Sequence, residues 1–234
     1  MKSLILCAGY GTRLRPLTYK IPKPLVSVWG YPIIEQIIRK INKYGISEFA
    51  INLHHLGDKI ERFLVHKRLP ISFHFLYENP ILDTGGAVKN ARDVLSKTDF
   101  IIHNGDILTD FDLDRMMDFH LKEKNDITLA VMERNGSRKL AFEDDMRLCG
   151  WTNLEKQIFA GEVTGKKLFS FAGVHIVSPK IFKYMPDEDI FGIFDFYIKN
   201  INNLKIQGYP INVKYWFDIG SRDKLLEIRK RVIE

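Results

Sequence analysis

Short apolar runs alternate with amphipathic segments through the first 133 residues of the chain. Four- to six-residue apolar or alternating runs predict strands, and apolar positions three and four residues apart, such as the isoleucines after Ile33, predict helices. The predicted strands are Leu4–Cys7, Glu48–Leu53, Ile71–Tyr77, Phe100–His103 and Ile127–Met132. The predicted helices are Ile33–Tyr44, Asp58–Val65, Gly86–Leu95 and one that begins at Asp112.

The remaining hundred residues are less regular. The polar stretch Arg134–Gly165 predicts a β-ribbon or loop, and Ser221 predicts the N-cap of a basic terminal helix. Between them we expect strands at Phe169–Val177 and Asn212–Phe217, a short helix at Pro179–Tyr184 and a helix at Ile190–Ile201.

Strands that alternate with helices predict an α/β fold. We expect a Rossmann-like, three-layer α/β/α domain with a mixed, mostly parallel central sheet. No repeat or low-complexity linker divides the chain, so residues 1–234 are predicted to form one domain with halves 1–133 and 134–234. Ligands of such sheets bind beyond the carboxyl ends of the strands.

Composition narrows the class of protein. No apolar stretch reaches the ~20 residues that span a bilayer, and the apolar start of the chain is too short for a signal peptide. Two cysteines, one of them in a predicted buried strand, favour a reducing cytoplasm. The net charge of +6 is spread among 29 acidic residues, so we expect neither a nucleic-acid nor a membrane partner.

The loop after the first predicted strand carries the strongest chemical signal. Gly9-Tyr10-Gly11-Thr12-Arg13 lacks the third glycine of a dinucleotide fingerprint, because Leu14 stands there, and it lacks the Gly-Lys-Ser/Thr of a P-loop. Lys23 follows between two prolines that restrict its backbone. Backbone N–H groups with cations behind them predict a polyphosphate site in which Arg13 and Lys23 contact phosphates.

Two aspartates follow predicted strands and are candidates for a metal site. Asp106, in Asn104-Gly105-Asp106, comes directly after Phe100–His103, and Asp218 comes directly after Asn212–Phe217. Mg²⁺ prefers one or two carboxylates together with phosphate oxygens and water. The pair therefore predicts a Mg²⁺ site beside the loop. The segment Asp83-Thr84-Gly85-Gly86 predicts a helix start that a flat ligand can approach closely.

The histidines are predicted to have structural roles. His54 and His55 lack a partner at zinc-ligand spacing, and His175 alternates with apolar neighbours in a predicted strand. We expect all three to pack within the fold and none of them to bind a metal.

These motifs, in this order, resemble the signature of the sugar-1-phosphate nucleotidylyltransferases. The first block is Gly9-x-Gly11-Thr12-Arg13-Leu14 followed by Pro22-Lys23-Pro24. Later blocks are similar in Leu82–Gly86, Asn104–Asp106, Phe171–His175 and Trp216–Gly220. The resemblance covers nearly the whole chain and is greatest for the short uridylyl- and guanylyltransferase members, which lack a C-terminal β-helix.

The resemblance implies a role for each block. The nucleotide-diphospho-sugar transferase fold would place a nucleotide-binding half before residue 133 and a sugar-phosphate half after it. The implied nucleotide-binding residues are Ala8, Gly9, Gly11, Thr12, Arg13, Lys23, Asp83, Gly85, Gly86, Asn104 and Gly105. Asp83 and Gly173 would bind the sugar, Asp106 and Asp218 the Mg²⁺, and Arg13 and Lys23 would be catalytic.

The implied reaction joins a nucleoside triphosphate (UTP, GTP, CTP or dTTP) to a sugar 1-phosphate and releases pyrophosphate, in a monomer or homodimer. Two departures leave the sugar open. Asp83 stands where many members have glutamate, and the usual Glu-Lys-Pro segment has only a partial counterpart in Glu155-Lys156-Gln157.

Three alternatives remain at this stage. A cytidylyltransferase for a non-sugar alcohol phosphate would share the loop. An inactive regulatory homologue would be expected to lose Arg13, Lys23 or an aspartate, all of which are present. A glycosyltransferase would normally carry Asp-x-Asp after a central strand, and the nearest match begins only at Asp110.

Overall fold

The computed structural model describes residues 1–67 and 70–231. Its strands are β1 (Lys2–Leu6), β2 (Ser27–Val28), β3 (Tyr31–Pro32), β4 (Glu48–Leu53), β5 (Ser72–Tyr77), β6 (Phe100–Asn104), β7 (Ile107–Thr109), β8 (Ile127–Met132), β9 (Arg138–Phe142), β10 (Leu148–Asn153), β11 (Ile158–Gly161), β12 (Lys167–Val177), β13 (Ile206–Pro210) and β14 (Trp216–Asp218). Its α-helices are α1 (Ile33–Asn42), α2 (Gly57–His66), α3 (Asp83–Asn90), α4 (Arg92–Leu95), α5 (Leu113–Glu123), α6 (Ile193–Lys199) and α7 (Arg222–Lys230). Single 3₁₀ turns lie at Thr12–Leu14, Leu17–Tyr19, Lys23–Leu25 and Pro179–Lys183.

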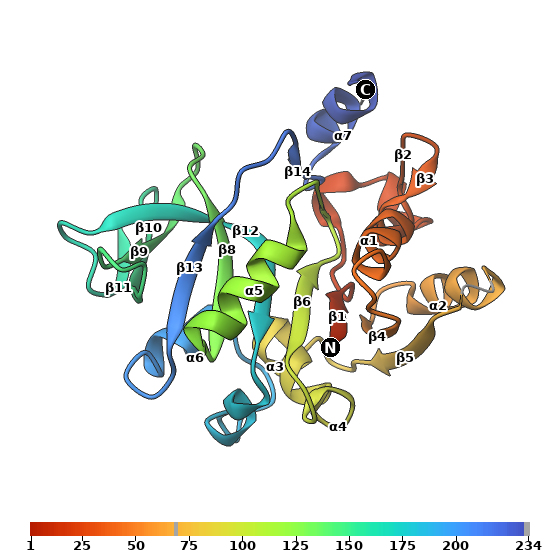
Figure 1. The fold of residues 1–234 in the computed structure, drawn as a ribbon. Helices are drawn as coiled ribbons and strands as arrows, with labels where there is room; N and C mark the ends of the chain where they lie inside the picture. The colour runs from red at the N-terminus through yellow and green to blue at the C-terminus, as the bar shows by residue number, and fades with distance from the viewer. Residues whose placement is uncertain (68–69, 232–234) are drawn as a thin grey trace.

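Ten strands form one mixed sheet. Its main path runs β11-β10-β9-β12-β6-β1-β4-β5, and β8 pairs with β12 and β13 beside that path. Strands β6, β1, β4 and β5 are parallel neighbours, whereas β12 runs antiparallel to both β6 and β8. The carboxyl ends of β1, β6 and β8 therefore share one edge, the edge near β14 in Figure 1. The mixed, mostly parallel α/β sheet that the sequence predicts is confirmed.

Two hydrophobic cores cover the two faces of this sheet. Successive strand residues point to opposite faces, so Ile101 belongs to the core under α1, α2, α5 and α7, and Ile102 to the core under α3, α4 and α6. Helix α1 buries its isoleucine stripe against the first core. The β9–β11 ribbon extends at one end of the molecule, and α2 and β5 lie at the other (Figure 1). No helix of the described residues is long and apolar enough to cross a bilayer.

Most predicted elements are present within a few residues of their predicted bounds. Glu48–Leu53 and Ile127–Met132 are strands with those bounds, and the ribbon predicted after residue 134 is β9, β10 and β11. Ser221 caps α7, because its Oγ accepts a hydrogen bond from the Lys224 amide at 3.4 Å. The predicted helix Gly86–Leu95 begins earlier, at Asp83, and is divided at Ala91 into α3 and α4.

The predicted strand Asn212–Phe217 is wrong in most of its length. Only β14, from Trp216, is extended and paired there, and it pairs with β7, a short strand that the sequence does not indicate. The strand that enters the main sheet is β13, parallel to β8. The backbone N–H groups of Lys214 and Tyr215 donate instead to Asp110 Oδ1, at 3.1 and 3.2 Å, so this segment is held by a side chain and not by a ladder.

Candidate active site

A cavity of about 370 Å³ opens at the carboxyl ends of β1 and β6, where the fold class predicts a ligand. Ten of the predicted site residues line it: Ala8, Gly9, Gly11, Thr12, Arg13, Lys23, Asp83, Asn104, Gly105 and Asp106. Gly220, two residues after the predicted ligand Asp218, also lines it. The structure therefore brings residues from three sequence blocks into one hollow.

The loop after β1 is shaped by Gly11. This glycine is left-handed at φ 62°, and a Cβ there would lie 2.9 Å from Thr18 Cγ2. Its carbonyl oxygen accepts hydrogen bonds from Thr18 Oγ1 at 2.8 Å and from the Leu14 amide at 2.9 Å. The loop is thus tied to the following 3₁₀ turns while its own residues line the cavity.

Lys23 reaches across the cavity floor to Asp106. Its Nζ forms a hydrogen-bonded ion pair with Asp106 Oδ2, although the two residues are 83 positions apart. Gly105 allows this turn, because a Cβ there would lie 2.5 Å from the Leu6 carbonyl oxygen of β1. The side chains of both partners are mostly buried, at 14% and 27% exposure, so the pair is less screened than a surface pair.

The second predicted metal ligand is placed beside the first by β7 and β14. Asp218 is in register with Ile107, the residue after Asp106, and the Ile219 amide donates to the Asp106 carbonyl oxygen at 3.0 Å. Asp218 Oδ2 forms an ion pair with Lys224 Nζ of α7 at 3.0 Å. The two predicted aspartates, which are distant in sequence, therefore stand on adjacent, paired backbone.

These two carboxylates fit a hard divalent cation only in combination with a phosphate-bearing ligand. Within residues 1–67 and 70–231, no group of three or more His, Cys, Asp or Glu side chains could hold a metal ion alone. Mg²⁺ suits such a site, because it commonly takes one or two carboxylates and completes its shell with phosphate oxygens and water. The oxygen-only donor set and the adjacent loop agree with that preference.

Gly85 and Gly86 do not line the cavity. A Cβ on Gly85 would lie 2.3 Å from the Phe191 ring, and one on Gly86 would lie 2.0 Å from the Asp189 carbonyl oxygen. The Gly85 amide donates to the Phe191 carbonyl at 2.9 Å. Close approach of the segment before α6 is therefore a packing reason for this glycine pair, and the predicted contact with a nucleotide base remains a prediction.

The two predicted sugar contacts occupy different positions. Asp83 lines the cavity in a left-handed conformation, φ 59°, that is uncommon for a residue with a side chain. Gly173, at φ 88°, lies where the β12–β8 register shifts, and a Cβ there would lie 2.6 Å from Ile107 Cγ1. Gly173 therefore lets β12 pass close to β7, the strand that follows Asp106.

Sequence reasoning missed a buried polar network in the lining of the cavity. Asn52 Oδ1 accepts from the Cys7 amide at 2.6 Å, and its Nδ2 donates to Glu78 Oε1 at 2.8 Å. Glu78 Oε2 accepts from the Leu82 amide at 3.0 Å. The network fastens the ends of β1, β4 and β5 to the loop before α3. Asn52, a polar residue within the otherwise apolar run Phe49–Leu53, is the one sequence signal for it.

Burial sets the protonation of several groups near the site. It raises the pKa of the Cys7 thiol far above its usual range, with the charge of Asp106 adding to the shift, so the thiol is protonated and is no nucleophile. It lowers the pKa of His103 and of His175 to about 3. His175 Nδ1 lies 2.9 Å from the Tyr197 hydroxyl, which agrees with the predicted structural role.

The other predicted structural histidines also have partners. His54 lies 2.8 Å from the Glu78 carbonyl oxygen and 3.0 Å from the Tyr10 hydroxyl. His55 Nε2 lies 2.8 Å from the Thr18 carbonyl oxygen. Both rings thus hold the loop before Lys23 against the end of β4.

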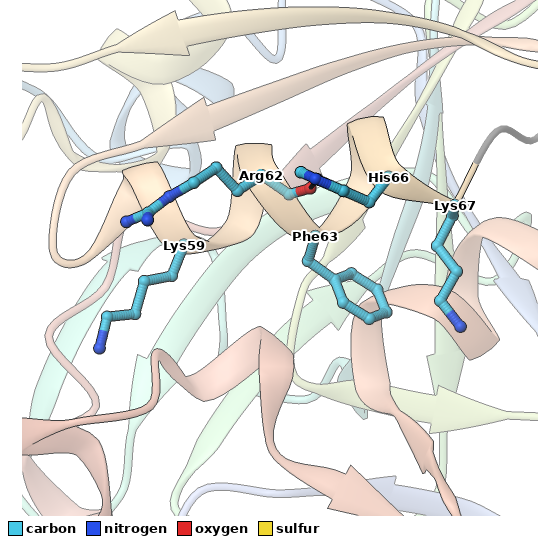
Figure 2. A pocket seen from close by; sticks show the side chains of 5 residues that line it. All are labelled: Lys59, Arg62, Phe63, His66 and Lys67. Atoms are coloured by element: carbon cyan, nitrogen blue, oxygen red, sulfur yellow. Dashed lines mark hydrogen bonds between the residues drawn. The ribbon is translucent and has the colours of Figure 1, made fainter.

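A second, shallow hollow lies beside α2 and is lined by Lys59, Arg62, Phe63, His66 and Lys67 (Figure 2). Its cations are already engaged: Arg62 pairs with Asp58, and Lys67 Nζ lies 2.9 Å from Glu35 Oε2. Lys59 Nζ donates to the Lys20 carbonyl oxygen at 2.7 Å. Phe63 supplies its apolar surface. We assign no ligand to this hollow, because its lysines and its arginine already bond to partners within the described chain.

The fold and the cavity define the class of protein. A mostly parallel α/β sheet ends in a tight loop, a buried Lys–Asp pair and a second aspartate, which together suit a nucleotide's phosphates and a divalent metal. The chain belongs to the nucleotidyl transferase family, whose sequence profile matches residues 2–142.

Named relatives agree with this assignment. The chain is 29% identical over 244 residues to a D-glycero-alpha-D-manno-heptose 1-phosphate guanylyltransferase of Aneurinibacillus thermoaerophilus, covering 99% of this chain and 98% of that protein. It is 36% identical over 135 residues to a mannose-1-phosphate guanyltransferase of Gibberella zeae, covering 56% of this chain and 37% of that longer protein. The crystal structure of HddC from Yersinia pseudotuberculosis superposes with a TM-score of 0.79 at 25% identity, over 98% of each chain.

Proposed function

We propose that this chain transfers a nucleotidyl group from a nucleoside triphosphate to a sugar 1-phosphate and releases pyrophosphate. The observation that carries the proposal is the Lys23–Asp106 pair under the loop Ala8–Arg13, with Asp218 on the neighbouring strand. Its similarity to two proteins named as sugar 1-phosphate guanylyltransferases supports the acceptor class. Their names also make GTP the first donor to test.

The chemistry needs charge neutralisation and positioning more than proton transfer. A phosphate oxygen of the sugar 1-phosphate attacks the α-phosphorus of the nucleotide, and the bond from that phosphorus to the β-phosphate bridging oxygen breaks. The nucleophile is already anionic and pyrophosphate leaves as an anion, so a protein general base is unnecessary. Arg13 and Lys23 stabilise the charge on the transferring phosphoryl group, and the loop amides align it in line.

Asp106 and Asp218 are the residues that would hold Mg²⁺. When bound, the ion would neutralise phosphate charge and link the protein to the nucleotide. Lys23 and Lys224 pair with these carboxylates in the structure, and Lys23 also lines the cavity in which the phosphates would bind.

We also place the enzyme in the cytoplasm. Cys7 and Cys149 are both free and buried, so neither half relies on a disulfide. Whether it acts as a monomer or a homodimer is a separate question, which sedimentation at assay concentration answers.

A grid of substrates tests the proposed function. Pyrophosphate release is measured with Mg²⁺ for each of UTP, GTP, CTP and dTTP against several sugar 1-phosphates and, as the alternative acceptor class, phosphocholine. The proposal expects release that depends on both a nucleotide and a sugar 1-phosphate. If pyrophosphate is released only when phosphocholine is the acceptor, the protein is an alcohol-phosphate cytidylyltransferase. If no combination releases pyrophosphate, an inactive homologue is favoured.

A further inference from the structure

Arg134 reaches the active-site edge of the sheet from the second half of the chain. It follows β8 by two residues, and the carboxyl end of β8 shares an edge with those of β1 and β6 because β12 runs antiparallel to both β6 and β8. No sequence motif marks this arginine. Its position near the predicted metal ligand Asp218 appears only in the folded chain.

The guanidinium of Arg134 rests on a fixed aromatic ring. Its Cζ lies 4.5 Å from the centroid of the Trp216 ring, and the Trp216 indole Nε1 donates to the Ala172 carbonyl oxygen at 2.8 Å. Stacking on an anchored indole holds the guanidinium plane in place. Because Trp216 and Asp218 are two residues apart in β14, their side chains share one face of that strand, so the stacked guanidinium lies on the side that carries the Asp218 carboxylate.

This guanidinium has no partner of its own. Among residues 1–67 and 70–231 it donates no hydrogen bond and forms no ion pair, and its Nε is buried and unpartnered. The nearby Asp218 uses Oδ2 for Lys224. A buried N–H on a charged group is costly to leave unsatisfied, and a planar guanidinium is best satisfied by a bidentate oxyanion.

A second cation adjoins it. Lys139 Nζ donates a hydrogen bond to the Arg134 carbonyl oxygen. Burial lowers the pKa of the Lys139 amine, and the positive charge of Arg134 lowers it further. The two cations, Arg134 and Lys139, outnumber the one carboxylate that acts on Lys139, Glu133, and such an excess of positive charge suits an anion.

Arg13 of the nucleotide loop also lies near Asp218. A Cβ on Gly220 would lie 2.8 Å from Asp218 Oδ1 and 3.1 Å from Arg13 Nη1, so both side chains meet at Gly220. The reaction brings together two anions, a nucleotide triphosphate and a sugar phosphate, and Arg13 and Lys23 line the cavity for the first.

We propose that Arg134, stacked on Trp216, binds the phosphate of the sugar 1-phosphate. The inference rests on the proposed function and adds to it a cation for the phosphate of the acceptor substrate. Arg134 is then a substrate-binding residue, and its loss weakens binding of the sugar 1-phosphate while binding of the nucleotide stays unchanged.

Steady-state kinetics with Arg134→Ala and Arg134→Lys test this. The assay measures pyrophosphate release with the best pair from the grid, starting from GTP and α-D-mannose 1-phosphate. For Arg134→Ala we expect the KM for the sugar 1-phosphate to rise about tenfold or more, as for a lost charge-assisted bond, and the KM for the nucleotide to stay within twofold. Arg134→Lys, which keeps the charge but loses the bidentate fork, is expected to be intermediate.

Arg138→Ala is the matched control, because it removes the same charge from an exposed position four residues away. It should leave both KM values within twofold. An unchanged KM for the sugar 1-phosphate in Arg134→Ala would overturn the inference, as would a parallel rise of both KM values, which marks a structural role. A wild-type enzyme that is silent in the same assay would instead overturn the proposed function, and the inference with it.

Discussion

At the scale of single residues, the site depends on a few side chains that are charged and largely withdrawn from water. Lys23 and Asp106 neutralise each other in the structure, and a phosphate would compete for the lysine while a metal would compete for the aspartate. Lys23 and Asp106 already stand in the cavity, so each can exchange its partner for a ligand with little movement. Electrostatic catalysis requires charged groups that are held in place in this way.

Replacement of Lys23 tests this role. We expect Lys23→Met to lower kcat about 10²- to 10³-fold, the usual effect of losing one contact to developing charge. Lys20→Met, which removes an exposed lysine from the same loop region, should retain wild-type kcat. Circular dichroism of both variants checks the fold, and a Lys23→Met enzyme with near-normal turnover would show that the lysine is not part of the machinery.

The Gly85–Gly86 pair has a packing role that can be measured apart from catalysis. Gly86→Ala places a methyl group 2.0 Å from a backbone oxygen, and such overpacking costs about 1–3 kcal/mol of the free energy of unfolding. Gly9→Ala, where no atom lies within 4 Å, should change that free energy by less than about 0.5 kcal/mol. Urea unfolding compares them, and equal stabilities would contradict the close approach to Asp189.

At the scale of elements, the short strands β7 and β14 position the second aspartate. Their pairing sets Asp218 beside Asp106, and the segment before β14 is fastened by Asp110. A carboxylate that accepts two backbone N–H groups replaces the ladder that a longer strand would have supplied.

Asp110→Ala leaves those two N–H groups without their acceptor, so we expect a loss of about 1–3 kcal/mol in the free energy of unfolding. Asp110→Asn keeps an acceptor oxygen and should lose less than half as much. Amide hydrogen exchange at Lys214 and Tyr215 should accelerate in the alanine variant alone. Unchanged exchange in that variant would mean that other contacts hold the segment.

The same elements show how far the sequence could predict the structure. The apolar run within Glu48–Leu53 is typical of a buried strand, so the local pattern was enough to predict this element. Lys23 could be selected as a site residue because prolines stand on both sides of it. β13 contains Gly208 and Pro210, and its strand state depends on β8 rather than on its own propensity. The proposed role of Arg134 could not be predicted from the sequence, because it depends on stacking against Trp216, which only the fold brings near.

At the scale of the whole molecule, β6 and β12 pair within the main sheet and join the segments before and after residue 133. His103 and His175 lie on these two strands, both buried. Their pKa values of about 3 are below the ordinary value of ~6.5, so both rings are neutral in the folded chain and take up protons on unfolding at mildly acidic pH.

The sign of the pH dependence follows from these depressed pKa values. The histidine contribution to stability is fully present above pH ~6.5 and is lost as pH falls toward 3, by up to ~1.4 kcal/mol per pH unit for each ring. The free energy of unfolding is measured in urea at several pH values between 7 and 4. We expect it to fall less steeply with decreasing pH in His175→Gln than in the wild type. His66→Gln, on α2, is the matched control, and identical slopes in all three proteins would contradict the account.

We propose above that this cavity moves a nucleotidyl group onto a sugar 1-phosphate. This is measured with [α-³²P]GTP and, in a parallel reaction, [γ-³²P]GTP, each with Mg²⁺ and a sugar 1-phosphate, in the wild type and in Lys23→Met. We expect the α-label to enter a sugar-linked nucleotide only when the sugar 1-phosphate is present, the γ-label to appear in pyrophosphate, and Lys23→Met to form little of either product. Release of the α-label as GMP, or equal transfer by Lys23→Met, would refute the proposed reaction.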